Sequence, residues 1–391
     1  METEKIRKDF PVLNKVIYLD NACQTLRPIQ VINKINEYYK EYPACGGRSY
    51  HKLGKKVDEE VNNARKTIQK FFNAKKSSEI IFTRNTTEGI NLIANSFDFK
   101  QSDCVLISDK EHNSNLVPWQ VLSKKGVRLE IFEFGNIDDF KSKLNSDVKL
   151  VSTLQTSNID GTSQSVQEII QLAHENKSLV LIDGAQSAPH RQVDVRKLDV
   201  DFFVCSGHKM MGPSGTGILY GKYDLLYKLN PFLVGGDTVE ETTYSKCTFL
   251  PPPEKFEAGL QNYAGIIGLG EAVKYLLRIG MKNIKEHEIE LNKYITEKLG
   301  NNEKIEILGP KDAEKRSGIF SFNIKSMNPH EIAIMLDSSA NIAVRSGAHC
   351  CHSWFNKNNI QGSVRASLYI YNNEEDVDKF IEEIKKILLF C

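Results

Sequence analysis

Apolar positions along the chain follow two patterns, which predict helices and strands in alternation. Five apolar residues recur at steps of three and four and predict an amphipathic helix: Val57, Val61, Ala64, Ile68 and Phe71. Short strand candidates follow at 79–82, 105–107, 129–134, 150–154, 179–182, 202–205 and 218–220. The segments 179–182 and 202–205 are continuous apolar runs, as expected of strands that are buried on both faces of a sheet.

Helical segments such as 166–174 fall between some of these strands. The alternation predicts an α/β fold, in which a mostly parallel sheet carries helices on both faces. At 391 residues the chain also exceeds the size at which one hydrophobic core keeps growing, so we expect two domains.

The alternation of helices and strands is interrupted near 244–253, where the three prolines 251–253 can continue neither a helix nor a central strand. Beyond it the pattern predicts a helical stretch to about 299, strands at 305–308 and 319–324, and a last helix around 377–388. The sequence thus predicts a large domain over 16–255 and a smaller α+β domain over 256–391, with 1–15 packing on the smaller one.

Composition narrows the class of protein. Hydrophobic residues make up 40% of the chain and charged residues 26%, and the net charge of +1 argues against nucleic acid or an anionic membrane as the main partner. Residues 1–8 alternate in charge, and no apolar stretch approaches a membrane span, so we expect neither a secretory signal nor an anchor. Eight cysteines without paired metal-type spacing favour a reducing, cytoplasmic location and no metal site.

A lysine and an aspartate lie just beyond the ends of two predicted strands. Ser206-Gly207-His208-Lys209 follows the run 202–205, and Asp183 follows 179–182. Ligands of open α/β sheets bind beyond the carboxyl ends of such strands. Pyridoxal phosphate needs a lysine to hold its aldehyde as an imine and a carboxylate to keep its pyridine nitrogen protonated, so the pair suits this cofactor. Taken singly, each residue also fits ordinary cap or surface chemistry.

Hydroxyl residues near a predicted helix start suggest where a phosphate binds. Thr86 or Thr87 opens a helix after the strand 79–82, and the N–H groups and dipole of a helix start favour an anion. The alternative is a plain threonine cap. Ser206 and His208 could supply further phosphate donors.

Three further side chains follow predicted strands. His112 could stack on a cofactor ring or serve as a structural hydrogen-bonding group. Asn158 and Gln186 could hydrogen-bond the cofactor's phenolic oxygen, or belong to turns.

A second segment that could carry chemistry is Arg345-Ser346-Gly347-Ala348-His349-Cys350-Cys351, followed by Arg365. A neighbouring Arg or His⁺ favours the thiolate that acts as a nucleophile. The alternative, two cysteines that fill a core, fits poorly with so polar a loop, so we interpret this segment as carrying a reactive cysteine.

Motifs along nearly the whole chain carry a family resemblance. They are Tyr18-Leu19-Asp20-Asn21-Ala22, Thr86-Thr87-Glu88-Gly89-Ile90-Asn91, Glu111-His112, Val117-Pro118-Trp119-Gln120, Asp183-Gly184-Ala185-Gln186, Ser206-Gly207-His208-Lys209, Gly212-Pro213, Phe256-Glu257-Ala258-Gly259 and 345–350. The chain resembles the class V aminotransferase superfamily of fold-type I pyridoxal-phosphate enzymes, and within it the group II (Suf-type) cysteine desulfurases.

The resemblance implies a role for each matching residue. Lys209 would carry the cofactor and move protons, Asp183 would pair with the pyridine nitrogen, and Gln186 would contact the phenolic oxygen. His112 would stack on the ring. The implied phosphate ligands are Thr87, Ser206 and His208.

The substrate side follows from the same resemblance. Asn158 and Arg365 would bind the substrate carboxylate, and Cys350 would accept the sulfur. His51 and Arg345 match positions that line the family's active site, without a defined role.

The implied activity is conversion of L-cysteine to L-alanine, with the sulfur held on Cys350 as a persulfide. A homodimer is implied, as is a sulfur-acceptor or scaffold protein for iron–sulfur cluster assembly. Alternatives are a selenocysteine lyase, another class V aminotransferase-like enzyme, or a catalytically idle sulfur-carrier or scaffold protein.

The sequence departs from the family pattern at three positions. Leu260 stands where a threonine usually donates to the phosphate across the dimer, and an isobutyl group cannot donate a hydrogen bond. Ala348 stands where a second histidine is common, and Cys351 where alanine is common. One hypothesis is that Cys351 relays or protects the persulfide; the alternative is a thiol with no part in turnover.

Overall fold

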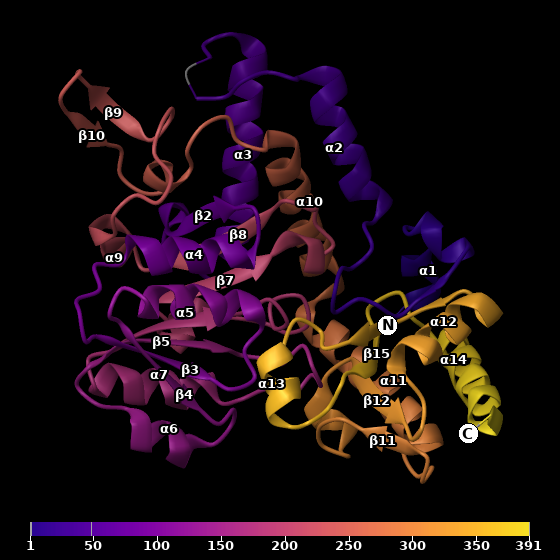
Figure 1. The fold of residues 1–391 in the computed structure, drawn as a ribbon. Helices are drawn as coiled ribbons and strands as arrows, with labels where there is room; N and C mark the ends of the chain where they lie inside the picture. The colour runs from indigo at the N-terminus through magenta and orange to yellow at the C-terminus, as the bar shows by residue number, and fades with distance from the viewer. Residues whose placement is uncertain (1, 48, 391) are drawn as a thin grey trace.

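A seven-stranded sheet forms the centre of the larger part of the molecule (Figure 1) in the computed structural model, which describes residues 2–47 and 49–390. In spatial order its strands are β2 (Ile80–Thr83), β8 (Gly217–Gly221), β7 (Phe202–Ser206), β6 (Leu179–Asp183), β5 (Val148–Leu154), β3 (Cys104–Ser108) and β4 (Arg128–Phe132). β8 runs antiparallel to both neighbours, and the other pairings are parallel. This confirms the predicted mostly parallel sheet.

Helices cover both faces of this sheet. One face carries α4 (Thr86–Ser96), α5 (Val117–Ser123) and α9 (Tyr223–Lys228); the other carries α3 (Lys52–Phe71), α6 (Ile137–Lys143), α7 (Val166–Glu175) and α10 (Tyr263–Ile279). Successive side chains of a strand point to opposite faces. Leu181 of β6 accordingly packs with the first group, while Val180 and Ile182 pack with the second. The continuous apolar runs therefore arise because both faces are covered.

A four-stranded antiparallel sheet forms the smaller part. Its order is β11 (Ile305–Ile307), β12 (Ile319–Ile324), β15 (Ser363–Ser367) and β14 (Arg345–Gly347). α11 (Met281–Leu299), α12 (Pro329–Ala340) and α14 (Glu374–Ile387) pack on it. A short strand near the N-terminus, β1 (Ile17–Tyr18), pairs in parallel with β13 (Ile342–Ala343). The start of the chain thus lies beside this smaller sheet.

The stretch predicted as helical up to 299 consists of two helices that meet at Gly280. Gly280 has φ of +86°, a conformation that glycine adopts readily and other residues rarely do. α10 packs on α3 and α2 (Ile29–Glu41), and its buried side chains belong to the core of the large sheet. The domain boundary at 255/256 stays a prediction, and α10 packs with the larger sheet.

The remaining elements are short. They are α1 (Thr3–Arg7), α8 (Val195–Leu198), α13 (His352–Lys357) and the hairpin of β9 (Val239–Thr242) and β10 (Cys247–Phe249), which projects from the body in Figure 1. Arg7 donates to the Tyr371 carbonyl and to Asp376 of α14. Across residues 2–47 and 49–390, no helix has the length and apolar character that crossing a membrane requires.

A buried ion pair secures the edge of the large sheet. Arg65 of α3 donates two hydrogen bonds of 2.7 Å to the Glu257 carboxylate and a third to the Ile80 carbonyl. Glu257 in turn accepts the Phe82 N–H of edge strand β2 at 2.7 Å. Because both residues of the pair are buried, removing one partner leaves an uncompensated charge.

We expect Glu257→Ala to lower the free energy of unfolding by about 3–5 kcal/mol, the usual cost of breaking a buried pair from one side. The measurement is the midpoint of urea unfolding. Glu382→Ala is the control, because Glu382 bonds Lys379 and Lys386 on an exposed helix face, where ion pairs contribute little. Equal midpoints for the two variants would contradict the assigned role of Glu257.

Candidate active site

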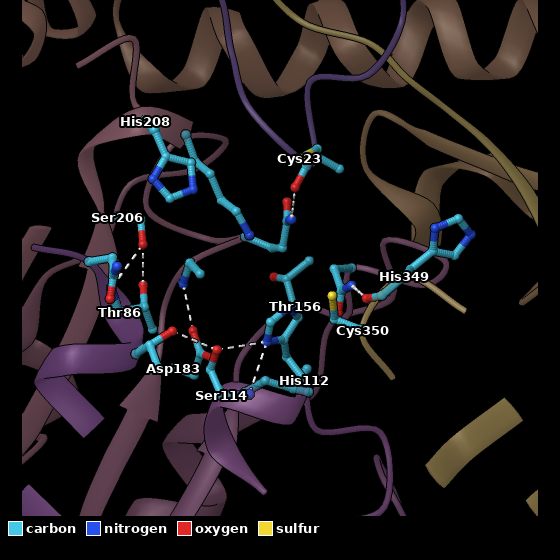
Figure 2. Close-up of a pocket in the computed structure, with 18 of the residues that line it drawn as sticks. Cys23, Thr86, His112, Ser114, Thr156, Asp183, Ser206, His208, His349 and Cys350 are labelled. Carbon is cyan, nitrogen blue, oxygen red and sulfur yellow. Dashed lines mark hydrogen bonds between the residues drawn. The ribbon is translucent and has the colours of Figure 1, made fainter. Parts of the chain in front are cut away.

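A cavity of about 230 Å³ opens where the strands of the large sheet end and the smaller part begins (Figure 2). Its lining includes every site residue predicted from sequence except His51: Thr86, Thr87, His112, Asn158, Asp183, Gln186, Ser206, His208, Lys209, Arg345, Cys350 and Arg365. Parallel strands bring their carboxyl ends to one edge, so residues far apart in sequence meet there. The residues of the smaller part complete the cavity from the opposite side.

Lys209 lies on a single 3₁₀ turn directly after β7. Its amine makes no hydrogen bond or ion pair with any of the described residues. Burial lowers the pKa of Lys209, and the charge of Arg365 lowers it further, whereas Asp183 opposes the shift. These surroundings favour the neutral amine, which is the form that condenses with an aldehyde.

Asp183 ends the neighbouring strand β6. Its Oδ1 accepts the Ala185 N–H at 2.9 Å, which fixes the carboxyl group at the cavity wall. Burial raises the pKa of Asp183, while Lys209 and the Ala185 N–H lower it. A cation placed against this carboxyl group would stabilise the ionised form, which is the role expected beside a protonated pyridine nitrogen.

Hydroxyl groups gather at the N-terminus of α4. The Oγ atoms of Thr86 and Ser206 lie 2.7 Å apart, and those of Thr87 and Ser114 also lie 2.7 Å apart. His208 lines the same end of the cavity, where burial lowers its pKa to about 4 and so keeps the ring neutral. Helix amides and hydroxyls together form a setting for an anion such as phosphate.

His112 is held as a neutral ring. Its Nδ1 accepts the Ser114 N–H at 3.1 Å, which leaves Nε2 to carry the proton. Burial lowers the pKa of His112 to about 3, with a further contribution from the charges of Lys209 and Arg365. A neutral ring at the cavity wall suits stacking on a flat cofactor.

Among residues 2–47 and 49–390, three buried polar atoms of cavity-lining side chains lack partners, namely Gln186 Oε1, Arg365 Nε and His349 Nδ1. Gln186 donates through Nε2 to the Ala22 carbonyl at 2.6 Å, and its Oε1 has no partner. Arg365, only 2% exposed, donates from Nη1 to the Asn158 carbonyl at 2.8 Å, and its Nε has no partner. A buried guanidinium N–H without an acceptor fits a substrate carboxylate.

The cysteine loop has an unusual backbone. Gly347, His349 and Cys350 have φ of +110°, +47° and +57°, so two non-glycine residues adopt the left-handed region. Hydrogen bonds from the larger part hold this shape: Asn113 N–H donates to the Cys350 carbonyl and Asn158 Nδ2 to the His349 carbonyl, both at 2.8 Å. The side chain of Cys350 is exposed and reaches the cavity.

The positive charges near Cys350 come from arginines rather than histidine. Burial lowers the pKa of His349 to about 2, with Arg365 and Arg345 adding to the effect. Its Nε2 lies 2.8 Å from Ser363 Oγ. Arg345 and Arg365 both line the cavity and keep their charge at neutral pH.

Cys351 faces the other way. It is 1% exposed, packs with Ile159, Leu308 and Phe355, and donates from Sγ to Asn158 Oδ1 at 3.2 Å. Burial raises the pKa of Cys351 to about 12. The packing favours a thiol with no part in turnover, and the relay hypothesis for Cys351 stays untested.

Some features of the site differ from the sequence expectation. His51 lies at the N-terminus of α3, where its Nδ1 accepts the Gly54 N–H at 3.2 Å, and it does not line this cavity. Cys23, Ser114 and Thr156 line the cavity although the sequence did not single them out. For Cys23 a signal existed, because it directly follows the motif 18–22.

Taken together, the donor set fits pyridoxal phosphate: a free amine, a buried carboxyl group, a neutral imidazole and a hydroxyl-rich helix start. Residues 17–380 match the family model described as aminotransferase class-V. The chain belongs to the class V aminotransferase family. The predicted fold and family are thereby confirmed.

Relatives within this family cover nearly the whole chain. A probable cysteine desulfurase from Staphylococcus aureus (strain COL) is 39% identical over 400 residues, which span 98% of this chain and 96% of the relative. Another from Halalkalibacterium halodurans is 38% identical over 401 residues, or 99% and 98% of the two chains. An apo structure of a cysteine desulfurase from Thermococcus onnurineus NA1 has a TM-score of 0.96 and 37% identity, covering 99% of this chain and 98% of that one.

The adjacent cysteines should differ sharply in reactivity. In the folded protein we expect iodoacetamide to label Cys350 and to spare Cys351, because the latter is buried and, with a pKa of about 12, is ionised to about one part in ten thousand at pH 8. Since its pKa is raised, Cys351 gains thiolate only as the pH approaches 12. Peptide mass spectrometry measures the labelling, with urea-unfolded protein as the control in which both react. Equal labelling in the folded state would contradict this geometry.

Proposed function

We propose that the protein is a pyridoxal-phosphate-dependent cysteine desulfurase, which converts L-cysteine to L-alanine and transfers the sulfur to Cys350. The observation that carries the proposal is the meeting of the Lys209 amine, the Asp183 carboxyl group and the Cys350 thiol at one cavity. The first two suit the cofactor, and the third adds a sulfur nucleophile. Relatives named as cysteine desulfurases support the same activity.

Cofactor binding would use the larger part of the chain. Lys209 would hold the aldehyde carbon, Asp183 the pyridine nitrogen, and Gln186 the phenolic oxygen, with His112 against the ring. Thr86, Thr87, Ser206 and His208 would hold the phosphate. When bound, pyridoxal phosphate supplies an electron sink for the electrons released at the substrate Cα.

Substrate binding would place the amino acid between the two parts. Arg365 offers its unpartnered Nε to the carboxylate, and Asn158 fixes Arg365 by accepting from Nη1. This orients the Cα–H bond and the thiol group of L-cysteine within the cavity. Lys209, whose pKa burial lowers, would take the Cα proton and later return a proton to the product.

Cys350 would then receive the sulfur. Its Sγ attacks the substrate sulfur, a new S–S bond forms, and the substrate C–S bond breaks. The electron pair of that bond stays with the carbon skeleton, which takes up a proton and leaves as alanine. Two arginines near the thiol, Arg345 and Arg365, provide the cationic surroundings in which nucleophilic cysteines occur.

The proposal also covers the sulfur acceptor, the homodimer, the location and the subgroup. The exposed position of Cys350 suits transfer of the persulfide to an acceptor or scaffold protein, for iron–sulfur cluster assembly or other sulfur delivery. Leu260 is 72% exposed and lies outside the cavity of its own chain, as expected of a position that faces the second copy in a homodimer. We also infer a cytoplasmic location and membership of the Suf-type subgroup.

The rival activities make different demands on the site. A transaminase has no use for a thiol such as Cys350, and an idle carrier has no use for an unpartnered Lys209. A selenocysteine lyase would use the same groups, because its substrate differs by one atom. The choice between L-cysteine and L-selenocysteine therefore rests on a direct comparison of the two substrates.

The decisive test supplies the protein with pyridoxal phosphate, L-cysteine and a thiol reductant, and measures alanine and sulfide. We expect Cys350→Ala to lose at least about 100-fold in both products, the scale on which removal of a nucleophile acts. Lys209→Ala should lose the activity and also the visible absorption of the lysine-bound cofactor. Cys247→Ala is the matched control, since Cys247 is exposed on the β9–β10 hairpin. Sulfide formation that is equal in wild type and Cys350→Ala would remove the assigned nucleophile.

Arg365→Lys tests the carboxylate site. A lysine keeps the charge and loses the planar set of donors, so we expect kcat/KM for L-cysteine to fall about 10- to 100-fold, with KM rising. Steady-state alanine formation gives both constants. Arg191→Lys, which changes an arginine that bonds Ser317 outside the cavity, serves as the control. An unchanged KM in Arg365→Lys would rule out this carboxylate contact.

A further inference from the structure

The cavity contains a second thiol, Cys23, that the proposed reaction does not use. Cys23 is partly exposed and follows the short segment that joins β1 to the smaller sheet, where Asp20 forms a bridge with Ser367 of β15. Figure 2 shows Cys23 and Cys350 on the side of the cavity opposite Thr86 and Ser206. Two thiols from distant parts of the chain thus share the substrate side of one cavity.

Arg345 contacts one of these thiols and lies close to the other in sequence. Arg345 donates from Nη2 to Cys23 Sγ at 2.9 Å. Arg345 also begins β14, and the chain runs from there directly into the loop that bears Cys350. A cationic donor at a partly buried thiol is the setting in which cysteines act as nucleophiles.

The arginines near Cys23 also give this part of the cavity a positive charge that suits an anion. The buried Arg365 has an unpartnered Nε there, and its Nη2 lies 3.5 Å from Asp20 Oδ1. Arg345 Nη1 lies 3.9 Å from the other oxygen of Asp20. Asp20 therefore offsets part of the charge of two guanidinium groups, and the remaining positive charge faces the cavity beside Cys23.

We propose that Cys23 is a second sulfur site, which accepts the terminal sulfur from the persulfide of Cys350. This inference rests on the proposed desulfurase function. In the step, Cys23 Sγ attacks the terminal sulfur of the Cys350 persulfide; the S–S bond on Cys350 breaks and its electron pair leaves on Cys350 Sγ. A new S–S bond forms on Cys23, and one proton passes from the Cys23 thiol to Cys350, so no oxidant or reductant is consumed.

The transfer regenerates Cys350 while the sulfur stays in the enzyme. Cys350 is exposed and can then attack a second substrate, whereas the partly buried Cys23 holds the first sulfur next to Arg345. One chain would carry sulfur on both cysteines before an acceptor arrives. Cys351 does not fill this place, because it is enclosed by Ile159, Leu308 and Phe355 and does not line the cavity.

The test maps sulfur onto individual cysteines of the cofactor-loaded wild-type protein. The protein is treated with about two equivalents of L-cysteine per chain, so that little free thiol remains to cleave the persulfides, and without added reductant or acceptor. It is then alkylated and digested under non-reducing conditions. Mass spectrometry of the peptides should find one extra sulfur atom on Cys23 as well as on Cys350. Cys23→Ser should reduce the sulfane sulfur bound per chain to roughly half, and Cys247→Ser should leave it unchanged.

Cys350→Ser distinguishes transfer of sulfur through Cys350 from direct transfer of sulfur from the substrate to Cys23. Because sulfur enters through Cys350, Cys23 should carry no extra sulfur in this variant. Arg345→Gln should lower the ratio of sulfur on Cys23 to sulfur on Cys350, a ratio that corrects for any loss of loading at Cys350 itself. The wild-type peptide map needs no variant, so it stands even if a substitution prevents folding.

Three outcomes would overturn the inference. Extra sulfur found on Cys350 alone, or as a longer chain on Cys350, would exclude Cys23 as a site. Sulfur on Cys23 in Cys350→Ser would make Cys23 a direct acceptor rather than a relay. Alanine is measured in the same samples: its absence from the wild type defeats the proposed function itself, whereas alanine with sulfur on Cys350 alone defeats only the relay.

Discussion

Asn158 holds together the side of the cavity that carries Cys350 and Arg365. Its Nδ2 donates to the His349 carbonyl, its Oδ1 accepts from Cys351, and its own carbonyl accepts from Arg365. Asn158, four residues beyond the end of β5, thus fixes the cysteine loop and Arg365, which both belong to the smaller part. The position of the Cys350 thiol relative to the Lys209 amine depends on these three contacts. A shift of about 1 Å between reacting groups is costly for the rate of a reaction.

Burial gives this cavity its distribution of charge. It keeps His112, His208 and His349 neutral and favours the uncharged amine of Lys209. The positive charge that remains belongs to Arg345 and Arg365, which stand on the substrate side. Under the proposed function, the amine would act as a base, while the arginines would hold the anionic carboxylate and sulfur groups. Proton transfer and sulfur transfer would then use different residues of one cavity.

Much of the fold and site follows from local pattern. The runs 179–182 and 202–205 are apolar because both faces of the sheet are covered, and the residues after them must meet at one edge. Asp183 and Lys209 could be placed from this rule alone. The orientation of the two adjacent cysteines could not, because it depends on Phe355 and Ile159 enclosing Cys351. His51 could not be placed from sequence either. A motif match suggested the active site, but the side chain caps a helix away from the cavity.

Cys23 shows why tertiary pairing decides the remaining chemistry. Its local sequence predicts nothing about sulfur, and it reaches the cavity because β1 pairs with β13 and Asp20 bridges to Ser367, contacts that span more than 300 residues. Those pairings place Cys23 against Arg345, at the start of the strand that leads to Cys350. Arg345 therefore contacts one thiol of the cavity through its side chain and leads along the backbone to the other. This arrangement comes from tertiary pairing, which no local sequence pattern reveals.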